Sequence, residues 1–258
     1  MPDTLIFEQP LNEKCRLLLR MAHLFDQLDF HLPQTERWHT RAALRALLDI
    51  ANVLARADVK PELLKELDFY NTVLSRVTPG PQVNMQALQQ IQAELRDTHA
   101  TLASQSGQLG EKLRKDDFLN SIYQRSAIPG GTSDFDLPQL HQWLQQDHAA
   151  RMACLQTWYD QVQMVRSAIN LLLRMIRHST TFVTNQAVRG FFQQNLDRDT
   201  KVQMVRIALP ATTDLFAEIS GGRHRFSIRF MQFMPGQAAI QTDQDIAFKL
   251  NICSTATA

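Results

Sequence analysis

The spacing of the apolar residues changes once along this chain, close to His178. From about residue 12 to 178, apolar side chains recur every three to four residues, as they do along one face of an α-helix. After residue 178 they alternate with polar residues or run together over the length of a strand. Because one type of secondary structure cannot satisfy both periods, the sequence predicts an α-helical domain followed by an antiparallel β domain.

Proline, glycine and short polar residues divide the helical region into consecutive segments. Asn12 is a suitable N-cap for the first helix, which should end before Pro33 because proline cannot continue a helix. Asp136, just before Leu137 and Pro138, is a suitable cap for a later helix. The expected helices cover residues 12 to 32, 35 to 57, 60 to 77, 84 to 104, 110 to 124, a short segment after 136, and 148 to 178.

Strand-like stretches occupy the remainder of the chain, at residues 186 to 193, 201 to 210, 225 to 233 and 245 to 252. The stretch TLIFEQ at residues 4 to 9 also has the composition of a strand. Because it precedes the helices, we expect it to pair with the C-terminal sheet. The predicted fold is α+β, with a helical domain at residues 12–178 and a β domain formed by residues 1–11 and 179–258.

The charges of the chain nearly cancel, with 27 Lys and Arg against 26 Asp and Glu, for a formal net charge of +1. Such a balance gives no overall attraction to nucleic acid or to anionic lipid. The apolar runs are shorter than the roughly 20 residues of a membrane-spanning helix, and we see no export signal. We therefore expect a cytoplasmic protein without membrane insertion, in which Cys15, Cys154 and Cys253 are reduced.

The sequence offers no constellation typical of an enzyme. Its eight histidines form no HExxH motif and have no CxxC partner, so no metal site is expected. The glycine pairs at 130–131 and 221–222 fit neither a dinucleotide-binding motif nor a P-loop, and no GxSxG motif is present. We expect no catalysis and no cofactor; a small-molecule enzyme would need a pocket with converging titratable groups.

Arginine and apolar residues alternate in the stretch GGRHRFSIRFMQF, residues 221 to 233. In a strand, Phe226, Ile228 and Phe230 point to one face, and Arg223, Arg225 and Arg229 point to the other. One interpretation is a solvated or edge strand whose charges resist edge-to-edge aggregation. The other is a docking face for a carboxylate-bearing peptide, because guanidinium groups bind carboxylates in bidentate fashion.

A nucleic-acid-binding module is an alternative, since arginines interleaved with aromatic residues are also found in RNA-binding sheets. Base stacking, however, needs exposed aromatic rings beside the cations. Here the phenylalanines and the arginines are expected on opposite faces of the strand. The near-zero net charge also disfavours this alternative, so we expect no nucleic-acid partner.

Four segments of the chain carry a family resemblance: FEQPLNEKCRLLLR at 7–20, ADVKPELLKELD at 57–68, AIPGGTSDFDLPQLHQWL at 127–144 and ISGGRHRFSIRFM at 219–231. With these segments in order, the chain resembles the ZapD family of bacterial cell-division proteins along nearly its whole length. The resemblance implies a cytoplasmic homodimer with a helical and a β domain. It also implies a non-enzymatic adaptor at the mid-cell division ring, which binds the C-terminal tail of the tubulin-like protein FtsZ and cross-links its filaments.

The resemblance also implies which residues form the tail-binding surface. The two arginines of the RFxIRF strand fall on Arg225 and Arg229, and the basic position before them falls on Arg223. A further arginine, at the end of the second helix, falls on Arg56, where a cation also suits the negative helix end. One basic position of a family relative falls on Asp117 here, and Arg114 or Lys115 are the nearby candidates to replace it.

Overall fold

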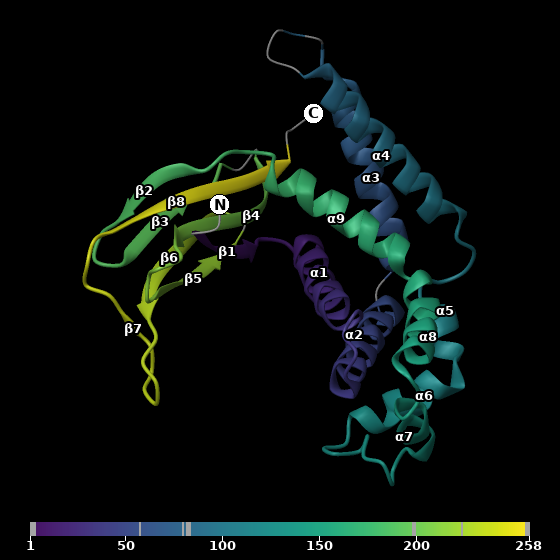
Figure 1. The fold of residues 1–258 in the computed structure, drawn as a ribbon. Helices are drawn as coiled ribbons and strands as arrows, with labels where there is room; N and C mark the ends of the chain where they lie inside the picture. Colours follow the sequence, from purple (N-terminus) through teal and green to yellow (C-terminus); the bar gives the residue numbers. More distant parts are fainter. Residues whose placement is uncertain are drawn as a thin grey trace. The chain divides into compact units, whose positions relative to one another are not determined.

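The computed structural model describes residues 4–56, 58–78, 80, 84–197, 200–222 and 224–255. These residues form an N-terminal strand, a series of α-helices and then antiparallel strands, which confirms the α+β class (Figure 1). The helices are α1 (Glu13–His31), α2 (Arg37–Arg56), α3 (Val59–Ser75), α4 (Met85–Ser104), α5 (Glu111–Lys115), α6 (Asp117–Ser126), α7 (Pro138–Leu144), α8 (His148–Asp160) and α9 (Gln163–Arg177). The strands are β1 (Thr4–Pro10), β2 (Val183–Ala187), β3 (Phe191–Asn195), β4 (Lys201–Pro210), β5 (Leu215–Gly221), β6 (Arg225–Gln232), β7 (Ile240–Gln241) and β8 (Ile246–Thr255).

Two compact units divide the chain. The β unit contains the described residues up to Leu19 together with those from Leu173 onward, and the helical unit runs from Arg20 to Leu172. The division falls within α1 and α9, so each of these helices contributes one end to the β unit.

The β unit is a sandwich of two sheets. The strand order is β1-β4-β8-β2 in the first sheet and β3-β6-β5 in the second, where β7 also pairs with β6. Its core includes Phe230 of the second sheet and Phe248 of the first, whose ring centroids are 5.1 Å apart. The N-terminal strand β1 pairs antiparallel with β4 from Thr4↔Pro210 to Pro10↔Met204. The predicted pairing of the N-terminal strand with the C-terminal sheet is therefore confirmed.

The stretch at residues 186 to 193 is not a single strand, as its composition had suggested. It contains the end of β2, a two-residue turn and the start of β3. Arg189 and Gly190 both have positive φ, of 51° and 69°, which is the backbone required for a tight hairpin turn. A Cβ atom at Gly190 would also collide with the carbonyl oxygen of Thr242. Both the positive φ and this close contact therefore favour glycine here. Through this turn the chain passes from the first sheet to the second.

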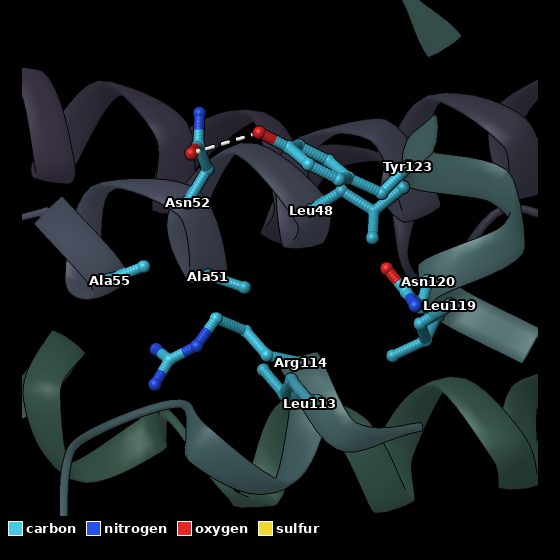
Figure 2. Close-up of a pocket in the computed structure, with 9 residues that line it drawn as sticks. All are labelled: Leu48, Ala51, Asn52, Ala55, Leu113, Arg114, Leu119, Asn120 and Tyr123. Atoms are coloured by element: carbon cyan, nitrogen blue, oxygen red, sulfur yellow. Dashed lines mark hydrogen bonds between the residues drawn. The ribbon is translucent and has the colours of Figure 1, made fainter. Parts of the chain in front are cut away.

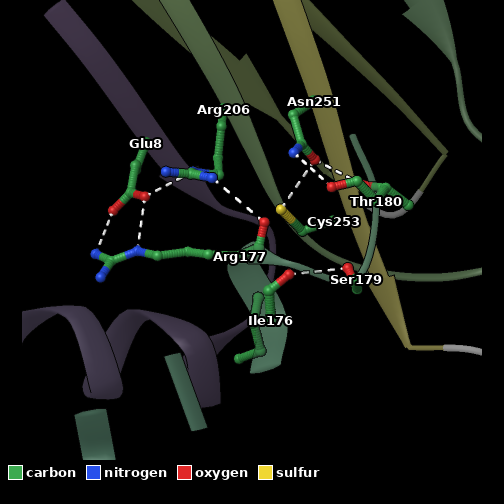
Figure 3. A network of polar contacts seen from close by, with 8 residues as sticks. All are labelled: Glu8, Ile176, Arg177, Ser179, Thr180, Arg206, Asn251 and Cys253. Atoms are coloured by element: carbon green, nitrogen blue, oxygen red, sulfur yellow. Dashed lines mark hydrogen bonds and ion pairs between the residues drawn. The ribbon is translucent and has the colours of Figure 1, made fainter. Parts of the chain in front are cut away.

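A polar network fixes β1 within the β unit (Figure 3). The carboxylate of Glu8 accepts hydrogen bonds from Nε and Nη2 of Arg177 at 2.9 and 2.7 Å, and from Nε of Arg206 at 2.8 Å. Farther along the same sheet, Asn251 accepts from the hydroxyl of Thr180 and from the thiol of Cys253. The charge-assisted hydrogen bonds around Glu8 link β1, β4 and the end of α9.

Helix ends follow the sequence prediction at some positions and depart from it at others. Asn12 caps α1 as predicted, because its Oδ1 accepts the backbone N–H of Cys15 at 2.8 Å. Asp136 does not cap a helix: α7 begins after Leu137 without a side-chain cap, and the carboxylate of Asp136 instead accepts from Ser133. The carboxylate that was expected to cap α7 is therefore engaged by the hydroxyl of Ser133 in the preceding turn.

Two predicted helices of the helical unit are each broken into two. Asp116 separates α5 from α6, because its carboxylate caps α6 at Leu119 N and also accepts from Nε1 of Trp158. The long helix predicted at 148 to 178 stops at Asp160 and resumes at Gln163. At this break the backbone changes to i→i−3 hydrogen bonds, among them Val162 N to Tyr159 O, which tighten and end the helix.

Candidate functional site

Strand β6 displays the two faces expected from its alternating sequence. Phe226, Ile228 and Phe230 are at most 1% exposed and contribute to the core between the sheets. Arg225 and Arg229 are exposed on the opposite face of the same strand. The burial of one face therefore holds both guanidinium groups on the surface, four residues apart, which corresponds to about 13 Å along an extended strand.

The position of β6 in the sheet decides one question that the sequence left open. β6 lies between β3 and β5, so it is a central strand and not an edge strand. Its backbone groups are already paired on both sides, and its arginines are not needed to prevent another strand from adding there. The edge-strand interpretation of these arginines is therefore wrong.

The neighbouring strands supply the other side chains of this surface. Directly opposite residues on paired antiparallel strands point to the same face. We call this surface the arginine face. Its members are Arg225, Ser227 and Arg229 of β6, Phe191, Gln193 and Asn195 of β3, and Glu218 and Ser220 of β5.

The guanidinium groups of the arginine face are available to a ligand. Within the part of the chain that the structure describes, neither Arg225 nor Arg229 forms an ion pair or a side-chain hydrogen bond. Beside Arg225 the surface is hollowed by a depression of about 390 Å³, whose lining includes Gln193, Ser220 and His224. Arg223, the third arginine predicted here, lies outside the described residues.

Arg56 is the last residue of α2 and belongs to the helical unit. Its side chain is exposed and has no ion pair among the residues described. The carbonyl oxygens of Leu54 and Ala55 nearby accept from the side-chain amide of Gln108, at 3.5 and 3.4 Å. Because Arg56 and the arginine face belong to different units, a shared tail site remains a prediction.

The two basic residues near Asp117 are already engaged within the helical unit. Arg114 donates to the backbone of Leu109 and to the side chain of Gln108. Lys115 donates to Glu111 at 2.6 Å, and this hydrogen bond lowers the pKa of the Glu111 carboxyl group. Asp117 itself is exposed in the first turn of α6. Replacement of the lost basic contact by Arg114 or Lys115 stays a prediction, and either side chain would have to give up these hydrogen bonds.

A separate cavity of about 210 Å³ lies between α2, α5 and α6 (Figure 2). Its walls include Leu48, Leu113 and Leu119, and the hydroxyl of Tyr123 donates to Asn52 Oδ1 at 3.1 Å on one side. The lining residues include no histidine, cysteine or carboxylate, so this cavity has no general base or nucleophile of those types. It is a small apolar site with a polar rim.

Across the described ranges, no group of three or more His, Cys, Asp or Glu side chains is arranged to hold a metal ion. In the same residues, no helix combines the length and apolar character needed to cross a membrane. The arginine face is thus the surface on which the chemistry of the predicted site residues is concentrated, with Arg56 at a separate position.

Comparison of the sequence with known proteins shows the family of this chain. A family model described as "ZapD: Cell division protein" matches residues 19–229, a region that ends at Arg229. The chain belongs to the ZapD family. It is 36% identical over 253 residues to the cell division protein ZapD of Methylococcus capsulatus, covering 98% of this chain and 99% of that protein. The ZapD of Pectobacterium atrosepticum is 35% identical over 229 residues, covering 89% and 90% respectively.

Membership of the ZapD family assigns this chain a role in cell division, and the family description names no reaction.

The members of the arginine face on β3 and β5 were not predicted from the sequence. Phe191 was placed within a longer strand, and Glu218 lies on β5, which was not predicted as a strand. Their proximity to Arg229 comes from strand register, for which the sequence of β6 contains no signal.

Proposed function

We propose that this chain is a non-enzymatic adaptor that binds the C-terminal tail of FtsZ and cross-links FtsZ filaments into bundles. One observation carries the proposal: in a member of a cell-division family, Arg225 and Arg229 lie on an exposed face anchored by buried phenylalanines, and neither forms an ion pair within the described residues. Each guanidinium offers a planar fork of N–H donors that matches a carboxylate. The tail would dock by charge-assisted hydrogen bonds to these two residues, supported by Arg223 and Arg56.

Cross-linking requires at least two tail sites in one particle, and we propose that a homodimer provides them. Simultaneous binding of two tails raises the overall affinity, because the second tail binds from a high effective concentration. The adaptor would act in the cytoplasm at the mid-cell division ring, and neither a cofactor nor a metal takes part in this mechanism. Light scattering of the purified full chain tests the dimer, and imaging of a fluorescent fusion in dividing cells tests the location.

The double substitution Arg225→Glu with Arg229→Glu tests the site. We expect it to abolish co-sedimentation with FtsZ filaments, since each replaced group would repel a carboxylate instead of binding it. Arg37→Glu with Arg96→Glu is a matched control. It changes the net charge equally at two exposed residues of the helical unit that have no ion pair among the described residues.

Circular dichroism and the mass of the particle should be the same for both double variants and for the unmodified protein. Normal bundling by a folded Arg225→Glu and Arg229→Glu variant would remove the arginine face as the tail site. Loss of bundling in the Arg37 and Arg96 control would instead show that binding follows net charge and not a particular surface.

Nucleic-acid binding is the less favoured function. Phe226 and Phe230 are 1% and 0% exposed, so neither ring of β6 is available to stack on a base. The ring of Phe191 on β3 is exposed beside Arg229, but the near-zero net charge of the chain disfavours a nucleic-acid partner. Filter binding with random single-stranded RNA separates the two functions. We expect the RNA to remain unbound under the conditions in which FtsZ filaments sediment with the protein.

A further inference from the structure

The two arginines of the arginine face have different neighbours. Arg225 lies opposite Asn195 on β3, and on its other side Gly222 donates its backbone N–H to the carbonyl of Arg225. An amide and a residue without a side chain therefore flank this guanidinium. Neither flanking residue adds charge or apolar surface, and His224 also lines the depression beside Arg225, so this end of the face suits a carboxylate.

Arg229, in contrast, is the middle one of three side chains of different chemistry that lie in a row across the strands. Phe191 is directly opposite on β3 and is 40% exposed, and Glu218 is directly opposite on β5 and is exposed. Neighbouring strands are about 4.8 Å apart, so this row of ring, guanidinium and carboxylate is roughly 10 Å wide. Side chains of neighbouring residues of a bound peptide can therefore contact all three.

Glu218 makes no ion pair with Arg229 or with any other cation in the described ranges. An exposed carboxylate at this position repels an acidic peptide and attracts a basic side chain. Phe191 offers the exposed part of its ring as apolar contact area in the same row. A purely acidic segment would use Arg225 well but would meet both an unfavourable charge and an unused ring near Arg229.

We propose that the arginine face recognises an extended peptide of mixed chemistry, with an acidic side chain at Arg225 and acidic, apolar and basic side chains together at Arg229. The inference rests on the proposed function, since it describes the tail that would bind there. Phe191 is the apolar contact and Glu218 the residue that selects the basic side chain. Arg225 and Arg229 lie at different points along β6, so the difference between their surroundings also fixes the direction in which the peptide runs along this strand.

Fluorescence anisotropy with three synthetic peptides of equal length tests this inference. All three carry the same aspartates: the first has only serine between them, the second also has one leucine, and the third has one leucine and one lysine. The full chain should bind the third peptide most tightly. Phe191→Ala should weaken binding of the two leucine-containing peptides by about five- to tenfold, because part of an aromatic contact is lost. The serine peptide should change by less than about twofold.

Glu218→Gln should remove most of the preference for the lysine-containing peptide and should strengthen binding of the serine peptide. Asn195→Ala is the matched control for position, because Asn195 is the residue of β3 opposite Arg225. We expect it to leave the order of the three peptides unchanged. Phe191→Tyr keeps the ring, and its near-normal affinity would show that Phe191→Ala acts through the lost contact and not through misfolding.

The outcomes distinguish this inference from the proposed function. If Arg225→Glu with Arg229→Glu abolishes peptide binding while Phe191→Ala and Glu218→Gln change no affinity, the mixed-chemistry inference is wrong and the tail site remains. If the double arginine variant binds all three peptides normally, both the tail site and the inference are overturned. Equal affinity of the unmodified protein for the three peptides would also contradict the inference.

Discussion

Arginine residues of the β unit occur in two different environments. Arg177 and Arg206 hold the carboxylate of Glu8, which is 17% exposed, and so join β1 to the rest of the fold. Arg225 and Arg229 occupy the outer face of β6 without any such partner in the described residues. Residues of the first kind stabilise the structure, while those of the second keep a hydrogen-bonding capacity that the proposed tail site would use.

The cysteines should differ in reactivity. Burial raises the pKa of Cys15 to about 12 and that of Cys253 to about 11, and both side chains are 0% exposed. Thiolate is the reactive form, so at pH 8 only about one in ten thousand and one in a thousand of these groups would be ionised. We expect iodoacetamide to label the half-buried Cys154 first in the native protein. Peptide mass mapping of the labelled sites provides the measurement.

Labelling in denaturant is the control, because all three cysteines should then react.

The same pKa values predict the sign of a pH effect on stability. An unfolded thiol ionises near pH 9, whereas the buried thiols stay protonated up to about pH 11, so the free energy of unfolding should decrease as pH rises above about 9. Rapid labelling of Cys15 in the native protein would contradict the burial of this residue.

At the scale of the element, β6 depends on its buried face. Phe226→Ala or Phe230→Ala should lower the free energy of unfolding by about 3 to 5 kcal/mol, through lost apolar burial and a residual cavity. Ser227→Ala, on the arginine face of the same strand, should change it by less than about 0.5 kcal/mol. Urea unfolding followed by circular dichroism measures both effects. Similar values for the two kinds of substitution would mean that β6 does not anchor the arginines through its phenylalanines.

Several features of the elements could be predicted because they depend on local chemistry. The cap at Asn12 needs only a short polar side chain before a helix, and the two faces of β6 follow from the two-residue period of a strand. The pairing of β1 followed from its position before the helices and from its strand-like composition. For the cap and for the two faces of β6, the deciding residues lie within one short segment.

The breaks within elements were not predictable from periodicity. Val162 is 0% exposed at the junction of α8 and α9, so the apolar stripe continues across the break and conceals it. Asp116 ends α5 because its carboxylate caps α6 and also accepts from Trp158, a residue far away in the sequence. Similarly, the row of Phe191, Arg229 and Glu218 depends on the register of three strands. Contacts between residues far apart in the sequence decide the helix break at Asp116 and this row of side chains, and the spacing of apolar residues does not predict such contacts.

For the whole molecule, the proposed tail contact has a measurable dependence on salt. Exposed charges are screened beyond a Debye length, which shortens from about 14 Å at 0.05 M to about 4 Å at 0.5 M salt. We therefore expect the affinity for the FtsZ tail to fall over this range, as measured by anisotropy with a labelled tail peptide. The affinity of the Arg37→Glu and Arg96→Glu control should fall with a similar slope.

Apolar contacts do not weaken in this way, since they are not screened by salt. The contribution of Phe191 should therefore be retained at 0.5 M salt, when that of Arg225 and Arg229 is reduced. An affinity that stays constant from low to high salt would indicate that apolar contacts alone hold the tail. It would contradict charge-assisted docking on the arginine face.

The pairing of β1 with β4 also has a consequence for the order of events during protein synthesis. About 190 residues separate Pro10 from its partner Met204, and a ribosome adding about 5 to 20 residues per second needs roughly 10 to 40 s to make them. During this interval the helical unit leaves the ribosome, while β1 has no β4 strand to pair with. The β unit can close only after β8, at residues 246 to 255, has been translated, so a shorter nascent chain cannot present the finished arginine face to the proposed filament partner.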